Sequence, residues 1–179
     1  MENIVRRTSP KPGKRCAFTG YRPQKLPFGF NENAAGCSAL KKRLSDAIRS
    51  LIDEGYTHFI SGGALGVDMF AAEAVLQLRK EFPWIVLEMV SPFDAQPDRW
   101  NDAYKARHAD LFNRADIVTV ISHAYTQSCL SRRNHYLVDN ADLMLAVFDG
   151  IPGGTAGTVA YAVAEHVPVR YVPVTEDAC

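Results

Sequence analysis

The stretch HFISGGALGVD, residues 58–68, joins a short apolar run to a glycine-rich turn and then to the start of an amphipathic segment. We expect a buried strand over 58–61, because the run is short and mostly apolar and glycines end it at once. From Val67 to Lys80 apolar residues recur at helical spacing, which predicts a helix with one buried face. A strand, a glycine turn and a helix in this order form the repeating unit of α/β proteins.

The same alternation runs through the rest of the chain. Further strands are expected at 16–19, 84–90, 117–121, 143–148 and 169–172, and further helices at 38–54, 98–114, 130–140 and 158–166. The expected strands are short and almost continuously apolar, which is typical of a parallel sheet covered on both faces. The sequence therefore predicts an α/β fold, a Rossmann-like three-layer α/β/α sandwich with a mostly parallel sheet.

The length of 179 residues is typical of one domain, which we place over 15–173. A flexible basic tail is expected over 1–14, where lysine and arginine alternate with proline and glycine, and a short C-terminal tail over 174–179. The four cysteines lie far apart and lack the spacing of metal ligands. We therefore expect neither a metal site nor a disulfide framework.

Charge and apolar content exclude several classes of protein. Twenty basic and 20 acidic side chains give a formal net charge of zero, whereas a protein that coats nucleic acid needs a basic excess. A hydrophobic content of 47% excludes bulk disorder. No apolar run approaches the roughly 18–20 residues of a membrane span, and the N-terminus lacks a signal-peptide pattern. We expect a cytoplasmic protein with no membrane partner and no nucleic acid as its main partner.

Ligands of parallel α/β sheets bind beyond the carboxyl ends of the strands. In the turn after 58–61, glycines let the backbone approach a ligand, and free helix amides face an anion. The candidate ligand-binding residues of this turn are Ser61, Gly62, Gly63, Gly66 and Asp68. Asp68 has two interpretations: it caps the helix, or it accepts hydrogen bonds from the hydroxyls of a sugar.

Two further junctions carry the same chemistry. The run DGIPGGTAGT, residues 149–158, follows an expected strand, and its hydroxyls and amides would hold a phosphate. Its candidate residues are Gly153, Gly154, Thr155, Gly157 and Thr158. After the first strand, Thr19 and Gly20 offer another amide turn, and Arg22 is either an anion clamp or a solvated cation.

Several other side chains have competing interpretations. Phe93 and Trp100 are expected in the core, although either could stack on a base. Arg132 and Arg133 are adjacent on an expected helix, so at most one of them points toward the site. His58 lies inside a strand and is interpreted as a packed histidine rather than a catalyst.

These motifs resemble a known superfamily. The run 61–68 resembles the S-G-x-x-x-G-[IV]-D loop of the DprA/Smf proteins, and 152–158 resembles the P-G-G-x-G-T loop of the LOG phosphoribohydrolases. Both belong to the SLOG superfamily of Rossmann-like nucleotide-ligand proteins. Within it, TGYRP at 19–23, the aromatic-acidic run 92–100 and YLVD at 136–139 are most similar to the uncharacterised bacterial YpsA-like group. The resemblance implies a homodimer or higher homo-oligomer.

The main functional hypothesis is a sensor or regulatory protein that binds a nucleotide-derived ligand, either ADP-ribose- or NAD-like or a nucleoside monophosphate. No other cofactor is indicated. One alternative is a LOG-type hydrolase of the N-glycosidic bond, with Asp68, Arg133 and Glu165 as catalytic candidates. At the position of the LOG glutamate, three residues after the G-T pair, this chain has Tyr161. The other alternative is a DprA-like, DNA-associated module that uses the basic tail and the arginine pair.

Overall fold

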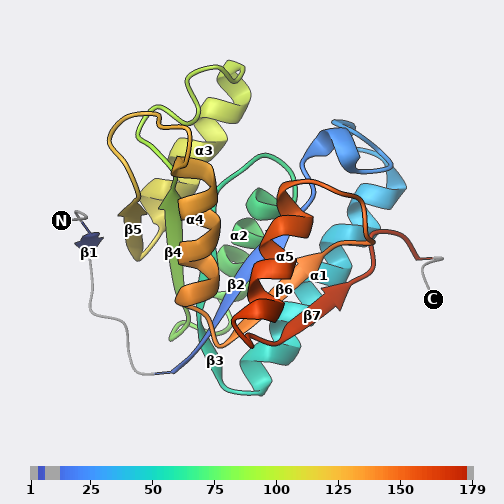
Figure 1. Cartoon of the computed structure of the whole chain (residues 1–179). Coiled ribbons are helices and arrows are strands. Elements are labelled where there is room, and N and C mark those ends of the chain that lie inside the picture. Colours follow the sequence, from blue (N-terminus) through green and yellow to red (C-terminus); the bar gives the residue numbers. More distant parts are fainter. Residues whose placement is uncertain (1–3, 7–12, 177–179) are drawn as a thin grey trace.

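The computed structural model describes residues 4–6 and 13–176 of the chain, and within them seven strands form one sheet (Figure 1). The strands are β1 (Ile4–Arg6), β2 (Lys14–Gly20), β3 (Tyr56–Ser61), β4 (Val86–Ser91), β5 (Ile117–Val120), β6 (Leu143–Val147) and β7 (Val169–Val172). The helices are α1 (Ala35–Asp53), α2 (Val67–Leu78), α3 (Asp102–Arg114), α4 (Cys129–Asp139) and α5 (Gly154–Ala164), with a short 3-10 helix η1 (Pro23–Lys25).

The sheet has the order β1-β5-β4-β3-β2-β6-β7. Strands β2 to β7 pair in parallel, and only β1 is antiparallel among the described strands. From β2 the chain adds β3, β4 and β5 on one side, and then returns to add β6 and β7 on the other. The direction of winding therefore changes between β2 and β6, which is where α/β sheets bind their ligands.

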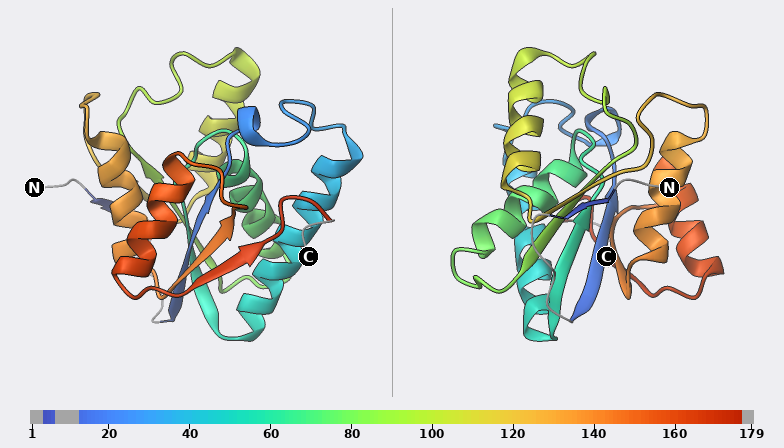
Figure 2. Two further views of the ribbon diagram at one scale, coloured as in Figure 1. Left: turned by 45° about the vertical axis from the view of Figure 1, so that its right-hand side comes forward. Right: turned by 90° about the vertical axis from the view of Figure 1, so that its left-hand side faces the viewer.

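The helices cover both faces of the sheet, as the sequence predicted. Helices α1, α2 and α3 lie on one face, and α4 and α5 lie on the other (Figures 1 and 2). Neighbouring strand residues alternate between the two cores: Phe18 packs on the α1–α2 side, and Ala17 packs on the α4–α5 side. Because both faces are buried, the strands are continuously apolar.

Helix α1 buries one apolar stripe, which includes Leu40, Leu44, Ile48 and Leu51, and it ends at Asp53, one residue before its predicted end. Gly55 has a φ of +93° directly after the helix, a conformation that favours glycine at a C-terminal stop. Three predicted helix starts were wrong, and the first is that of α1, which begins at Ala35 rather than at residue 38. Helix α3 begins at Asp102 rather than residue 98, because the side chain of Asn101 caps it by accepting the Tyr104 amide at 2.9 Å.

Helix α5 begins at Gly154, four residues before its predicted start at Thr158. The amide of Gly157 already donates to the carbonyl of Gly153 at 3.0 Å, so the glycine-rich residues form the first helical turn. The loop between β6 and α5 is therefore shorter than predicted, because the residues from Gly154 onward belong to the helix.

The two expected tails contribute to the domain. Ile4–Arg6, expected in a flexible tail, forms the edge strand β1 against β5, while residues 1–3 and 7–12 lie outside the described chain. Val174, placed in the C-terminal tail by the sequence, is buried in the core, and Arg43 donates to its carbonyl at 3.0 Å. None of the helices in the described ranges combines the length and apolar character required to cross a membrane.

Candidate functional site

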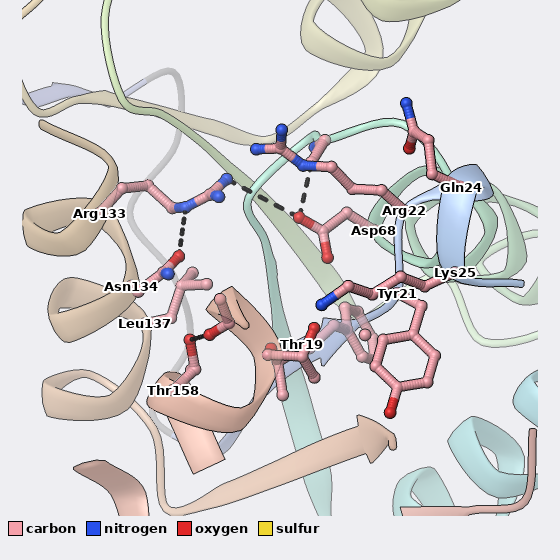
Figure 3. Close-up of a pocket in the computed structure, with 15 residues that line it drawn as sticks. Thr19, Tyr21, Arg22, Gln24, Lys25, Asp68, Arg133, Asn134, Leu137 and Thr158 are labelled. Carbon is pink, nitrogen blue, oxygen red and sulfur yellow. Dashed lines mark hydrogen bonds and ion pairs between the residues drawn. The ribbon is translucent and has the colours of Figure 1, made fainter. Parts of the chain in front are cut away.

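A cavity of about 340 Å³ lies at the carboxyl ends of β2 and β6, where the winding of the sheet changes direction (Figure 3). The loop after β2, the start of α2, one face of α4 and the start of α5 line it. Many of the predicted site residues meet here: Thr19, Gly20, Arg22, Asp68, Arg133, Gly154, Thr155 and Thr158. These candidate residues therefore line one common cavity, and their role in ligand binding stays a prediction.

The N-terminus of α5 forms one wall of the cavity. Gly153 precedes the helix with a φ of +144°, and a Cβ at Gly154 would meet no atom within 4 Å. Lys25 reaches this turn from η1, and its Nζ donates to the carbonyl of Pro152 at 2.5 Å. The first amides of a helix carry partial positive charge, so this wall combines a helix terminus with a full cation.

A buried ion pair forms the opposite wall. Arg133, from α4, places its Nη1 3.7 Å from Oδ2 of Asp68, and both residues are more than nine-tenths buried. Burial raises the pKa of Asp68, against the influence of Arg133 and of the Ala64 amide, which donates to Oδ2 at 3.3 Å. Burial likewise lowers the pKa of Arg133, although the carboxylate of Asp68 opposes the shift.

The cavity carries an excess of positive charge. Arg22 and Lys25 are exposed, Arg133 is buried, and Asp68 is the one carboxylate among the described residues that line the cavity. In Figure 3, Arg22 and Arg133 extend toward Asp68 from two sides. Three cations facing one carboxylate favour an anionic ligand.

The polar groups of the glycine-rich turn after β3, residues 61–66, are bonded mainly to the protein itself. The hydroxyl of Ser61 donates to the carbonyl of Asp68 at 2.8 Å and accepts the Gly63 amide at 3.3 Å. These groups are therefore occupied by the turn itself. Several predicted ligand-binding residues do not line the cavity: Ser61, Gly62, Gly63, Gly66, Gly153 and Gly157.

Gly66 is required by the close approach of two loops. Its φ is +90°, and a Cβ there would lie 2.6 Å from the carbonyl oxygen of Tyr21. The next amide, of Val67, donates to that same carbonyl at 3.2 Å. The first amide of α2 is thus occupied by a hydrogen bond to the loop after β2.

Sequence reasoning missed four polar side chains that line the cavity: Tyr21, Gln24, Lys25 and Asn134. The hydroxyl of Tyr21 donates to Oδ1 of Asp149 at 2.5 Å and accepts the Ile151 amide at 3.0 Å. It therefore fixes the loop that leads into α5. Pro23, which begins the short helix η1, was the available signal that this loop is ordered.

Other candidates lie away from the cavity. Glu165 is the exposed C-cap of α5, and it follows Thr158, the last residue of this helix that lines the cavity, by seven residues, or roughly 10 Å along the helix. Tyr161 does not line the cavity, and its hydroxyl donates to Asp139 at 2.9 Å. Of the two adjacent arginines only Arg133 faces the cavity, while Arg132 is exposed, as helical geometry predicted.

His58 is a packed histidine, as predicted. Its side chain is 3% exposed, and Nε2 lies 2.8 Å from Oε2 of Glu88, which is also buried. The hydroxyls of Thr119 and Tyr136 donate to the other oxygen of Glu88, at 2.8 and 2.7 Å. This network ties α4 to three strands of the sheet and lies outside the cavity.

Comparison with known sequences supports the resemblance. A family model described as the YspA SLOG family matches residues 16–168. UPF0398 protein BH1768 of Halalkalibacterium halodurans is 33% identical over 138 residues, which cover 76% of this chain and 72% of that protein. UPF0398 protein YpsA of Bacillus subtilis is 28% identical over 138 residues, which cover 76% of each chain.

Two solved structures share the fold. DNA processing protein A from Helicobacter pylori, studied for its single-stranded DNA binding mode, superposes with a TM-score of 0.61 at 18% identity and covers 92% of this chain and 67% of its own. DNA processing protein A from Streptococcus pneumoniae gives a TM-score of 0.63 at 17% identity, covering 92% of this chain and 52% of its own. At such identities the likeness demonstrates the Rossmann-like architecture alone.

Proposed function

Because the chain belongs to the YspA SLOG family, we propose that it is a sensor or regulatory protein that binds a nucleotide or nucleotide-derived ligand. The ligand would be an ADP-ribose- or NAD-like molecule or a nucleoside monophosphate. The binding site is the cavity between β2 and β6.

The wall formed by α5 and Lys25 carries this proposal. Gly154 leaves open space in front of the first turn of α5, and the Lys25 ammonium lies beside that turn. A phosphate there would accept hydrogen bonds from backbone amides and face a lysine cation. Arg22 would add a second charge from the side of the β2 loop.

The other wall suits a sugar better than a phosphate. A carboxylate repels a phosphate but accepts hydrogen bonds from hydroxyl groups, and Asp68 lies in this wall with Thr19 and Asn134 nearby. Arg133 holds the Asp68 side chain in place. A phosphorylated ribose oriented from α5 toward Asp68 would match the charge of both walls.

Calorimetric titration with ribose 5-phosphate, AMP, ADP-ribose and NAD tests the proposal. Lys25→Ala should weaken binding of the phosphorylated ligands by about tenfold, because a charge-assisted contact is lost. Lys42→Ala is the matched control, since Lys42 is an exposed lysine on α1 that pairs with Asp46 far from the cavity. Absence of binding by all four compounds at millimolar concentration would overturn the proposal.

Hydrolysis of an N-glycosidic bond is the second candidate function. Asp68 favours it, because burial raises the pKa of this cavity carboxyl toward the range in which a group can transfer protons. The proposed reaction does not use Glu165, because this residue lies at the C-terminal end of α5 and does not line the cavity. Release of free base from AMP, abolished by Asp68→Asn and retained by Glu165→Gln, would support the activity.

A DNA-associated role draws little support from the site. Arg133 is 5% exposed and points into the cavity, so it is not available to a DNA backbone. The homodimer and the cytoplasmic location stay predictions; sedimentation equilibrium and cell fractionation test them.

A further inference from the structure

A second cavity of about 280 Å³ adjoins the first and shares Arg22 and Gln24 with it. We propose that this second cavity receives the base of the nucleotide whose phosphate lies at α5. The inference rests on the proposed function and deepens it, because it assigns a place to each part of the ligand.

Among the described residues, none gives the first cavity an exposed aromatic face for a base. Its aromatic lining residues are Phe18 and Tyr21, which are 0% and 1% exposed. Their rings pack against neighbours inside the protein, Phe18 on Phe59 and Tyr21 on Phe148. A base placed there would meet mainly charged and hydroxyl groups.

The second cavity offers three aromatic side chains, Phe93, Trp100 and Tyr125. The ring of Tyr125 is 66% exposed and stands edge-on to Phe93, with centroids 5.4 Å apart. Leu65 and Leu130 complete an apolar surface. Nucleotide bases stack on aromatic side chains of this kind whichever base is present, because every base has a flat π face.

Trp100 is supported from behind by a neutral ring. His108 lies edge-on to Trp100 at 5.4 Å and stacks on Phe112 at 4.2 Å. Burial lowers the pKa of His108 to about 4, so the imidazole is uncharged at neutral pH. The ring that packs against Trp100 therefore adds no charge to the aromatic wall.

Two amides lie where the edge of a base would come. Gln24 and Gln96 both line the second cavity, and a primary amide can donate and accept hydrogen bonds at once. Arg22 is the one charged residue among the described lining residues, and it also lines the first cavity. The ligand would thus pass along Arg22, with its base among aromatic rings and its phosphate at the helix terminus.

Comparing the affinity for a sugar phosphate, which lacks a base, with the affinity for a nucleotide tests this assignment. Calorimetry with ribose 5-phosphate and AMP is carried out on the full chain and on Tyr125→Ala. We expect the variant to bind AMP about tenfold more weakly and ribose 5-phosphate with unchanged affinity, because only the stacking contact is lost. Tyr125→Phe should retain AMP binding.

Tyr171→Ala is the matched control, since Tyr171 is also an exposed tyrosine, 52% accessible, but lies on β7. Unchanged AMP affinity in Tyr125→Ala, or equal losses for AMP and ribose 5-phosphate, would overturn the base site while leaving the proposed function intact. Tighter binding of an oligothymidylate than of thymidine monophosphate would overturn the assignment to a free nucleotide. Failure of every ligand to bind the unmodified chain would overturn the proposed function itself.

Discussion

The guanidinium of Arg133 lies against the backbone of Gly62, with Nη1 donating to the Gly62 carbonyl at 2.5 Å. A Cβ at Gly62 would come within 2.1 Å of that same nitrogen. The glycine therefore makes room for an arginine that arrives from α4, 71 residues later in the chain. This contact places a buried cation beside Asp68, at the edge of the cavity.

Gly62→Ala should displace Arg133 from the turn and weaken ligand binding. The added methyl group would also lie 2.9 Å from Oδ2 of Asp68, so the ion pair is disturbed from both sides. We expect a loss of about 2 kcal/mol in the free energy of unfolding, measured by urea denaturation. Gly36→Ala is the control: its Cβ would meet only Phe28, at 3.6 Å, and stability should hold or rise slightly.

Arg133→Met should leave Asp68 buried without its cation. We expect the free energy of unfolding to fall by about 3–5 kcal/mol at neutral pH. Without the arginine the pKa of Asp68 rises further above its ordinary value of 3.8. A carboxyl whose pKa is higher in the folded than in the unfolded protein stabilises the fold at pH values below its unfolded-state pKa. That stabilisation is lost as the pH rises through the folded-state pKa. The deficit should therefore be smallest near pH 4 and grow toward pH 8.

Urea denaturation at both pH values measures this dependence. Adding Asp68→Asn to the variant should restore part of the stability at pH 8, because no charge is then buried. Arg132→Met, at the exposed neighbouring position, should change stability by less than about 0.5 kcal/mol. An equal deficit at pH 4 and pH 8 would contradict the role of Asp68.

Tyr21→Phe should loosen the loop before α5 while keeping the buried ring. The hydroxyl donates to Asp149 and accepts the Ile151 amide. Loss of these two hydrogen bonds should lower the free energy of unfolding by about 1–2 kcal/mol. Hydrogen exchange at the Ile151 amide should accelerate, and affinity for phosphorylated ligands should fall. Tyr171→Phe, on β7, should leave both measurements unchanged; unaltered exchange in Tyr21→Phe would refute the anchoring role.

Glu88→Gln tests the buried network beneath α4. Although burial opposes it, hydrogen bonds from His58, Tyr136 and Thr119 hold the pKa of Glu88 below its ordinary value of 4.5. A carboxyl whose pKa is lower in the folded than in the unfolded protein stabilises the fold at pH values above its unfolded-state pKa. That stabilisation is lost as the pH falls through the folded-state pKa. The variant should lose about 2 kcal/mol at pH 7, and the deficit should shrink below about pH 4.5.

Thermal or urea unfolding across pH 3.5–7 measures this trend, in which the deficit grows with rising pH, as it does in Arg133→Met. Glu165→Gln provides the exposed control and should change stability by less than about 0.5 kcal/mol. A deficit in Glu88→Gln that is constant over this pH range would show that its ionisation does not contribute.

Local sequence signals predicted the order of the elements correctly. The apolar stripe of α1 and the continuous apolar strands depend on spacing within one segment, which is visible without a structure. The starts of α3 and α5 were harder to predict, because a capping side chain at Asn101 and glycines in a first turn are decided by a few local hydrogen bonds. The pairing of Ile4–Arg6 with β5 joins residues more than a hundred positions apart.

Local sequence patterns were enough to predict a mostly parallel α/β sandwich with glycine-rich turns after its strands, because strand burial and turn composition are local properties. Tertiary structure alone decided which groups face the cavity. It directs the glycines of the first turn toward Tyr21 and Arg133, and it brings Lys25 to the start of α5. Each of these outcomes depends on contacts between distant segments, which arise only when the sheet is assembled.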